Sequence, residues 1–148
     1  EITFYWVGDG LYKNKILDKL NKFKNFEWLG ALEYPEKVRE YLTEIDAYAL
    51  ISGIDMSPLT LQEAQLMQKP VIATKVGGIP ELMIDTKTGY LVEKGNIEDL
   101  IEKIQLIMND EKKREELGKA GKKFVEENFS WDIIAKQFKI IAKQYVNE

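Results

Sequence analysis

Short runs of strand-forming residues alternate with helical segments along this chain, and this alternation restricts its fold more than any other feature. Five runs are rich in β-branched, aromatic and apolar residues, and glycine, proline or polar residues bound them. Repeated strand-helix units predict an α/β domain with a Rossmann-like parallel sheet and flanking helices. The expected strands span residues 2–7, 26–29, 47–52, 71–74 and 90–92.

The expected helices carry apolar residues at helical spacing and have recognisable starts. Pro35 opens one helix, because a proline at the first helical position gives up an amide that has no partner. Asn96, with Asp99 three residues later, predicts the cap of another. The last helix, residues 131–146, has an apolar stripe that is most simply a face packed on a core, although a face without a partner stays open. The stripe consists of Trp131, Ile134, Phe138, Ile141 and Tyr145.

Length and composition fit one domain that spans residues 1–148, with 45% hydrophobic and 31% charged residues. The 21 basic and 25 acidic side chains are interspersed, which argues against nucleic acid as a partner. The chain has no cysteine and no histidine, so carboxylates, hydroxyls and backbone amides must do any chemistry, and no metal site is expected. No apolar run approaches the ~20 residues of a membrane span, and the start reads as a strand. We therefore expect a cytoplasmic chain that is not an integral membrane protein.

Ligands of open parallel sheets bind beyond the carboxyl ends of the strands, where loops turn into helices. This rule selects the glycine loop at residues 8–10, the loops at residues 52–57 and 74–80, and the turn after Val92. Residues 8–10 read Gly-Asp-Gly, but a dinucleotide fingerprint would need its third glycine at Lys13, so that interpretation fails. The pair Gly77-Gly78 marks a sharp turn of the backbone or a close approach to a ligand.

The segment that starts near Ser57 combines features of an anion site. Ser57 is the expected N-cap and Pro58 the expected first helical residue, so the amides of Leu59 and Thr60 should point out of the helix end without partners. Such an end attracts phosphate. Glu63 is one turn beyond Thr60 and could share its side of the helix, although a loop Asp55 and a solvated Glu63 remain the simpler alternative for an acid pair alone.

A longer motif gives these residues a specific interpretation. From Asp55 through Ser57 to Asn96 the chain follows the pattern E-G-F-G-x-x-x-x-E-A-x-x-x-G-x-P-V-I-A-x-x-x-G-G-x-P-E. It thereby resembles the retaining glycosyltransferases of family 4, which have the two-domain GT-B fold and use nucleotide sugars. The resemblance implies the C-terminal, donor-binding half of a hexosyltransferase for polysaccharide or other glycan synthesis, with no metal and no cofactor besides the donor.

The resemblance also assigns roles to residues. Asp55 contacts the transferred sugar and is the catalytic residue, while Glu63 contacts the ribose. The glycine loop Gly8-x-Gly10 corresponds to a donor-side V-G-x-G loop. Met56-Ser57-Pro58 replaces the family's G-F-G, and Pro58 has no amide to donate. The implied donor-binding residues are Gly8, Gly10, Asp55, Met56, Ser57, Leu59, Thr60, Glu63, Gly77 and Gly78.

Family members are longer than this chain, and the resemblance places two parts outside it. One is the N-terminal acceptor-binding domain. Association with a membrane through that domain stays open, and without the domain we expect the isolated chain to be inactive. The other is the first central strand of a 3-2-1-4-5-6 sheet. Without that strand the order reads 2-1-3-4-5, and we favour a filler strand from elsewhere over direct closure of strand 2–7 on strand 47–52. The alternatives to a transferase are a flavodoxin-like, non-catalytic nucleotide- or protein-binding module and a fragment of a GT-B sugar-nucleotide epimerase.

Overall fold

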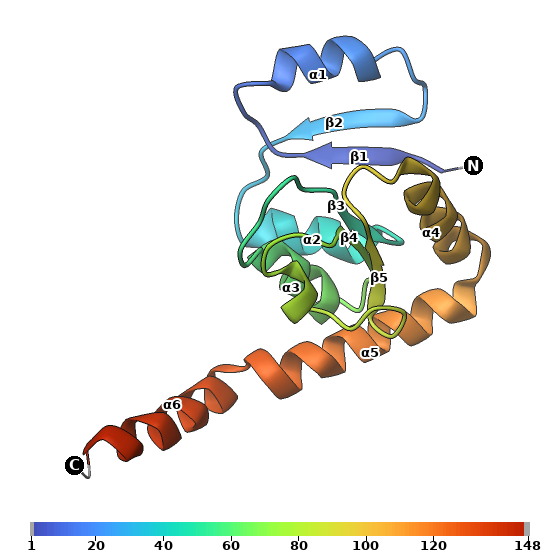
Figure 1. The fold of residues 1–148 in the computed structure, drawn as a ribbon. Helices are drawn as coiled ribbons and strands as arrows, with labels where there is room; N and C mark the ends of the chain where they lie inside the picture. Colours follow the sequence, from blue (N-terminus) through green and yellow to red (C-terminus); the bar gives the residue numbers. More distant parts are fainter. Residues whose placement is uncertain (1, 147–148) are drawn as a thin grey trace. The chain divides into compact units, whose positions relative to one another are not determined.

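The structure is a computed structural model that describes residues 2–146 (Figure 1). The described chain forms two compact units, residues 2–41 and 42–146, and the boundary falls inside helix α2, Glu36–Glu44. Each unit contains its own parallel sheet. The predicted α/β class with parallel strands and flanking helices is therefore confirmed.

The first unit is a strand-helix-strand motif. Strand β1, Phe4–Val7, pairs in parallel with β2, Phe26–Gly30, and helix α1, Lys13–Leu20, connects them. The register sets Phe4 opposite Phe26 and Trp6 opposite Trp28. None of the residues of helix α1 is buried.

The second unit contains the sheet β3-β4-β5, whose strands are Tyr48–Leu50, Val71–Thr74 and Gly89–Val92. Helix α3, Leu59–Leu66, connects β3 to β4, and the 3-10 turn η1, Ile79–Glu81, lies between β4 and β5. All pairings are parallel, so the carboxyl ends of the three strands lie at one edge. Strand β3 is shorter than the expected strand over residues 47–52.

The core of the second unit surrounds β4, in which all four residues are buried. Burial of successive residues shows that both faces of this strand are covered, as is typical of parallel sheets. Ile72 on β4 joins a cluster with two β5 residues and with the helices α4, Ile97–Asn109, and α5, Glu111–Phe129. The cluster consists of Ile72, Tyr90, Val92, Ile107 and Leu117, with Ala47, Leu100, Ile104 and Met108 packed against it.

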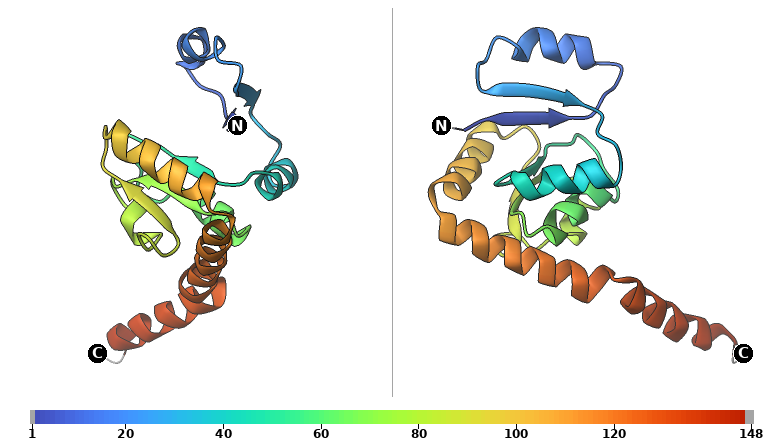
Figure 2. Two further views of the ribbon diagram at one scale, coloured as in Figure 1. Left: turned by 90° about the vertical axis from the view of Figure 1, so that its right-hand side faces the viewer. Right: turned by 180° about the vertical axis from the view of Figure 1, so that it is seen from behind.

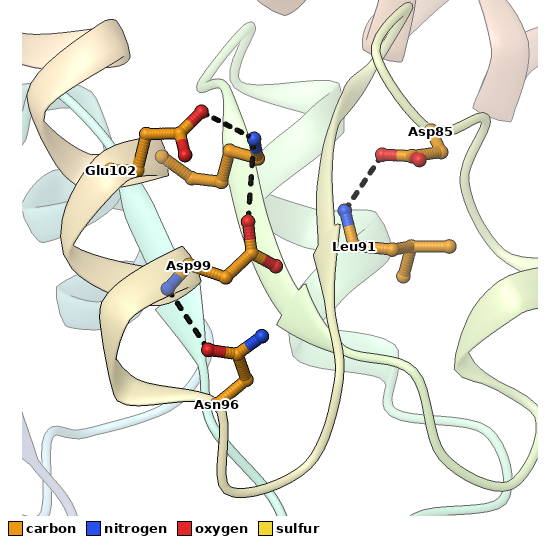
Figure 3. Close-up of polar contacts among 6 residues, drawn as sticks. Asp85, Leu91, Asn96, Asp99 and Glu102 are labelled. Carbon is orange, nitrogen blue, oxygen red and sulfur yellow. Dashed lines mark hydrogen bonds and ion pairs between the residues drawn. The ribbon is translucent and has the colours of Figure 1, made fainter.

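Helix α4 begins as predicted. The Asn96 side chain accepts a hydrogen bond from the Asp99 amide at 3.1 Å (Figure 3). The cap satisfies one of the amides that have no partner in the first turn. One turn on, the Lys103 ammonium pairs with Asp99 at 3.3 Å and with Glu102 at 2.9 Å, and on the neighbouring segment Asp85 accepts from the Leu91 amide at 2.9 Å. These contacts stabilise the first turns of α4 and the segment that leads into β5.

Helix α5 approaches the backbone just after the end of α3 so closely that no side chain fits between them at one point. A Cβ atom on Gly118 would come to 1.9 Å from the Gln68 carbonyl oxygen, which is backbone and cannot turn away. Gly121 lies over the Gln65 side chain, which is fully buried and donates from Nε2 to the Leu82 carbonyl at 2.9 Å. The α3–α5 contact therefore requires glycine on α5.

Helix α6, Trp131–Val146, continues beyond the end of α5 and leads away from the sheet of its unit (Figure 2). No side chain from Trp131 to Tyr145 is buried, and Trp131 is 87% and Phe138 70% exposed. The interpretation of this stripe as a face packed on a core is therefore wrong. The helix has the expected bounds, but the apolar face has no covering partner among the described residues.

The strand order of the two sheets bears on the expected 2-1-3-4-5 arrangement. The ladders run β1–β2 and β3–β4–β5, and within residues 2–146 no ladder joins β1 to β3. Each sheet is thus confined to its own compact unit. A filler strand from another segment remains an expectation.

Candidate functional site

Two loops meet at the carboxyl edge of the second sheet. One follows β3 and carries Asp55 and Met56, and the other follows β4 and carries Gly77 and Gly78. The Gly78 amide donates to the Asp55 carbonyl at 3.0 Å. A Cβ atom on Gly77 or Gly78 would come to 1.9 Å from the Asp55 or the Met56 carbonyl oxygen, respectively. Only a glycine pair permits this approach, so the predicted turn is a close contact between two loops.

A threonine hydroxyl fixes the beginning of the Asp55 loop. Thr74, the last residue of β4, accepts from the Ser52 amide at 2.9 Å and donates to the Ser52 carbonyl at 2.7 Å. The Ser52 hydroxyl in turn donates to the Ile54 carbonyl at 2.8 Å. Lys94, from the loop after β5, donates to the Gly53 carbonyl at 3.0 Å. The loop is thus held by the end of β4 and by the loop after β5, and the Lys94 ammonium already has a protein partner.

The start of α3 differs by one residue from the prediction. Pro58 is the N-cap, with φ −69° and ψ 109°, and Leu59 is the first helical residue. The expected cap by Ser57 is wrong, since no side chain caps this helix. The Pro58 carbonyl accepts from the Leu61 amide at 3.2 Å, while the amides of Leu59 and Thr60 are the ones that a helix leaves without an internal partner. The two amides without an internal partner at the start of α3 are therefore those of Leu59 and Thr60, the same two that the sequence predicts.

The Tyr48 side chain, on β3, connects this strand to α3. Its hydroxyl donates to the Thr60 hydroxyl oxygen at 2.8 Å. Burial raises the pKa of the Tyr48 phenol, and the carboxylates of Glu63 and Asp55 raise it further. Both acids are therefore close enough to the phenol to act on it through space. The structure thus pairs Thr60 with Tyr48, whose pKa responds to both predicted acids. The sequence did not identify this tyrosine, because its position is typical of an ordinary strand aromatic.

The glycine loop of the first unit is ordered by its own contacts. Gly8 has φ +127°, a conformation that other residues rarely adopt. Asp9 accepts from the Gly10 amide at 2.7 Å and from Lys13 at 2.9 Å, and the Lys13 hydrogen bond lowers the pKa of the Asp9 carboxyl. The Trp28 indole donates to the Gly8 carbonyl at 2.8 Å. Gly8 and Gly10 thus belong to the first unit, and the other eight predicted residues belong to the second.

Other features of the surface do not coincide with these loops. An open depression of about 460 Å³ is lined by Tyr90 and by polar side chains of α4 and α5, including Glu102 and Lys113, and by none of the predicted residues. Across the described residues, no group of three or more histidine, cysteine, aspartate or glutamate side chains is arranged to hold a metal ion. Among the helices of the described segment, none has the length and apolar character needed to cross a bilayer.

The chain is similar to a known family and to several of its members. The family model "Glycosyl transferases group 1" matches residues 2–124. An uncharacterized glycosyltransferase from Methanocaldococcus jannaschii is 35% identical over 134 residues, which are 89% of this chain and 38% of that protein. The sulfoquinovosyl transferase SQD2 of Arabidopsis thaliana is 32% identical over 148 residues, which are 98% of this chain and 28% of that protein.

Solved structures show the same likeness. A variant of TarM from S. aureus, crystallised in complex with Fondaparinux, alpha-GlcNAc-glycerol and UDP, superposes with a TM-score of 0.80 at 26% identity. The match covers 93% of this chain and 28% of that chain. The 148 residues thus span about a third of the length of these relatives.

Proposed function

The chain belongs to the group 1 glycosyl transferases, and from this premise we propose that it is the donor-binding half of a retaining, family 4 enzyme that transfers a sugar from a nucleotide sugar. Its α/β fold matches the C-terminal domain of GT-B glycosyltransferases. The acceptor would bind to a second domain, which these 148 residues do not contain. The chain matches only 38% and 28% of the length of the two relatives, and this partial coverage supports the division.

One observation carries the proposal. The Gly77-Gly78 turn lies directly on the backbone of Asp55 and Met56, at the sheet edge where α/β folds bind ligands. Two loops from neighbouring strands are thereby fixed beside the start of α3. Backbone amides and a helix N-terminus favour anions, with a partial charge of roughly +0.5 at the helix end. A diphosphate would be stabilised there without a metal ion.

One predicted acid precedes this helix start in the chain and the other follows it. We assign Glu63 to the ribose hydroxyls and Asp55 to the hydroxyls of the transferred sugar, where Asp55 would be the catalytic residue. The amides of Leu59 and Thr60 would hold the diphosphate between them, and Met56 and Ser57 would border the sugar. In the first unit, the Gly8–Gly10 loop is assigned to the donor as well. These roles follow the matching positions of the family motif. The hydrogen bond between Tyr48 and Thr60, and the effect of both carboxylates on the pKa of Tyr48, support the grouping.

The donor class follows from the relatives. The TarM variant binds UDP, and SQD2 transfers a sulfoquinovosyl group, so we propose a nucleoside diphosphate hexose as the donor and a glycan or glycolipid as the product. We further propose that the enzyme works in the cytoplasm, in keeping with a sequence that has no cysteine. Any attachment to a membrane would come from the acceptor-binding half.

The test is a thermal-shift panel on the protein in which this chain is joined to its acceptor-binding domain. UDP-, GDP- and ADP-sugars are compared with the free sugars and the free nucleosides. We expect one nucleotide class to raise the melting temperature, because a ligand that binds only the folded state stabilises it. Asp55→Asn should abolish transfer and keep nucleotide binding. Absence of stabilisation by all three classes would contradict the proposal, whereas binding without transfer by the wild type would favour the non-catalytic module.

A further inference from the structure

The Tyr48 side chain is in hydrogen-bond contact with Thr60, a proposed donor-binding residue of the second unit. Its phenol oxygen lies 2.8 Å from Thr60 Oγ1 and donates to it. Burial raises the pKa of the phenol above its usual value of 10.0, so the phenol keeps its proton at neutral pH. Tyr48 is therefore available as a hydrogen-bond donor whenever the enzyme works.

The location of Thr60 makes this contact relevant to the ligand. Thr60 is the second residue of α3, one helical turn before Glu63, and its side chain is exposed. A hydroxyl accepts and donates at the same time. Because Tyr48 donates to the Thr60 oxygen, this bond does not use the Thr60 proton, which is available to another acceptor. A hydroxyl that already accepts a bond also donates more strongly, by about 10–30%.

We propose that Tyr48 is a positioning residue for the donor diphosphate: it orients the Thr60 hydroxyl so that Thr60 donates its proton to a phosphate oxygen at the start of α3. This inference rests on the proposed function. The bond order would be Tyr48 O–H to Thr60 Oγ, then Thr60 O–H to phosphate. The simpler role, in which the pair only fastens α3 to β3, makes a different prediction, because it has no preference for phosphate.

The experiment compares four proteins that contain this chain joined to its acceptor-binding domain: the wild type, Tyr48→Phe, Thr60→Val and the double variant. Calorimetry measures affinity for UDP, GDP and ADP and for the matching nucleosides. For the diphosphate that binds, we expect Tyr48→Phe to weaken affinity by roughly threefold to tenfold, the effect of one hydrogen bond. Affinity for the matching nucleoside should stay within about twofold, since it has no phosphate.

The double variant separates a relay from two independent effects. In a relay Tyr48 acts only through Thr60, so the double variant should bind no more weakly than Thr60→Val alone. Thr60→Ser keeps the hydroxyl and should retain the sensitivity to Tyr48→Phe. Tyr145→Phe, on the exposed face of α6, is the matched control and should change no affinity.

Three outcomes would overturn the inference. Tyr48→Phe could weaken diphosphate and nucleoside equally, it could cause no loss, or the losses in the double variant could be additive. If the wild type binds none of the three diphosphates, the proposed function itself fails, and this result is distinct because it does not involve Tyr48. A melting temperature measured without ligand for each variant assigns any general loss of structure to folding.

Discussion

Glu63 is the single side chain whose charge tests the donor site most directly. Glu63→Gln keeps the size of the side chain and removes the charge that would accept the ribose hydrogen bonds, and a charge-assisted bond contributes about 1.5–3 kcal/mol. We expect donor affinity in the joined protein to fall by about one to two decades, with an unchanged melting temperature. Glu126→Gln, on the exposed side of α5, is the control. Unaltered affinity would make Glu63 a structural helix residue.

Gly78 tests the contact between the two loops. A Cβ atom there would come to 1.9 Å from the Met56 carbonyl oxygen, and backbone must move to admit it. We expect Gly78→Ala to lower the free energy of unfolding by about 3 kcal/mol or more, measured by urea denaturation. Gly53→Ala is matched, because its Cβ would meet only Lys94 side-chain atoms at 3.7 and 3.9 Å. It should stay within about 0.5 kcal/mol of the wild type, and equal losses in both variants would contradict the close approach.

Tyr48 gives the second unit a dependence on alkaline pH. Burial raises the pKa of its phenol above 10.0, with Glu63 and Asp55 adding to the shift. Below the unfolded pKa both states hold the proton; at higher pH the unfolded state ionises first, so stability falls as pH rises through the folded pKa. From about pH 9 to pH 11, the melting temperature of the wild type should therefore fall more steeply than that of Tyr48→Phe. Parallel curves would show that the phenol is not shielded.

At the scale of residues, the sequence predicted the site residues that follow from motif spacing. It missed the residues whose role depends on side-chain contacts with other elements. Asp55, Thr60, Gly77 and Gly78 could be chosen because loops after neighbouring parallel strands meet. Tyr48 and Thr74 could not, because a strand tyrosine and a strand threonine have no local signal for their partners on other elements. Their contacts became visible only with the register of β3 and β4.

At the scale of elements, the packing of α5 on α3 makes an unusual prediction. Glycine to alanine in the middle of a helix normally stabilises by about 0.5–1 kcal/mol. At Gly118 the sign should be reversed, since the new Cβ would come to 1.9 Å from the Gln68 carbonyl oxygen, and we expect a net loss of about 1–3 kcal/mol. Urea denaturation measures it. Gly121→Ala meets only side-chain atoms of Gln65, at 3.2 Å or more, and should cost less. A stabilised Gly118→Ala would disprove the close α3–α5 contact.

The elements themselves were largely predictable, but only some of their ends were. The cap at Asn96 and the bounds of α6 follow local chemistry, which a sequence shows directly. Strand β3 ends at Leu50 because its pairing with β4 ends there, and the partner's register is not a local property. For Ser57, the rule for caps chose the residue before Pro58, whereas the backbone of Pro58 itself takes the extended cap conformation.

At the scale of the whole molecule, we expect the isolated chain to lack transferase activity. Transfer depends on holding donor and acceptor together, and loss of that proximity removes up to ~7–11 kcal/mol of rate enhancement. The measurement is product formation from a nucleotide sugar and acceptor by the 148-residue chain, beside the joined protein. Product that increases in proportion to the concentration of the purified chain would contradict the proposed division of labour.

The larger arrangement shows where sequence patterns stop. Alternation of strands and helices was enough for the α/β class, but the expected single sheet corresponds to two sheets in two compact units. The stripe on α6 has core periodicity, yet Trp131, Phe138 and Tyr145 are exposed. Periodicity tells which residues share a face of a helix, and only the tertiary structure tells whether that face is covered.

The hydroxyl of Thr74 has a consequence for the time at which the Asp55 loop forms during synthesis. Ser52 is bonded to a residue 22 positions later in the chain, and the glycine pair that lies on Asp55 comes later still. While the ribosome is still adding α3, the loop has neither support. The loop therefore reaches its final conformation only after β4 has emerged and paired with β3. A nascent chain that stalls before Thr74 would contain Asp55, but the loop around Asp55 would not have its final conformation.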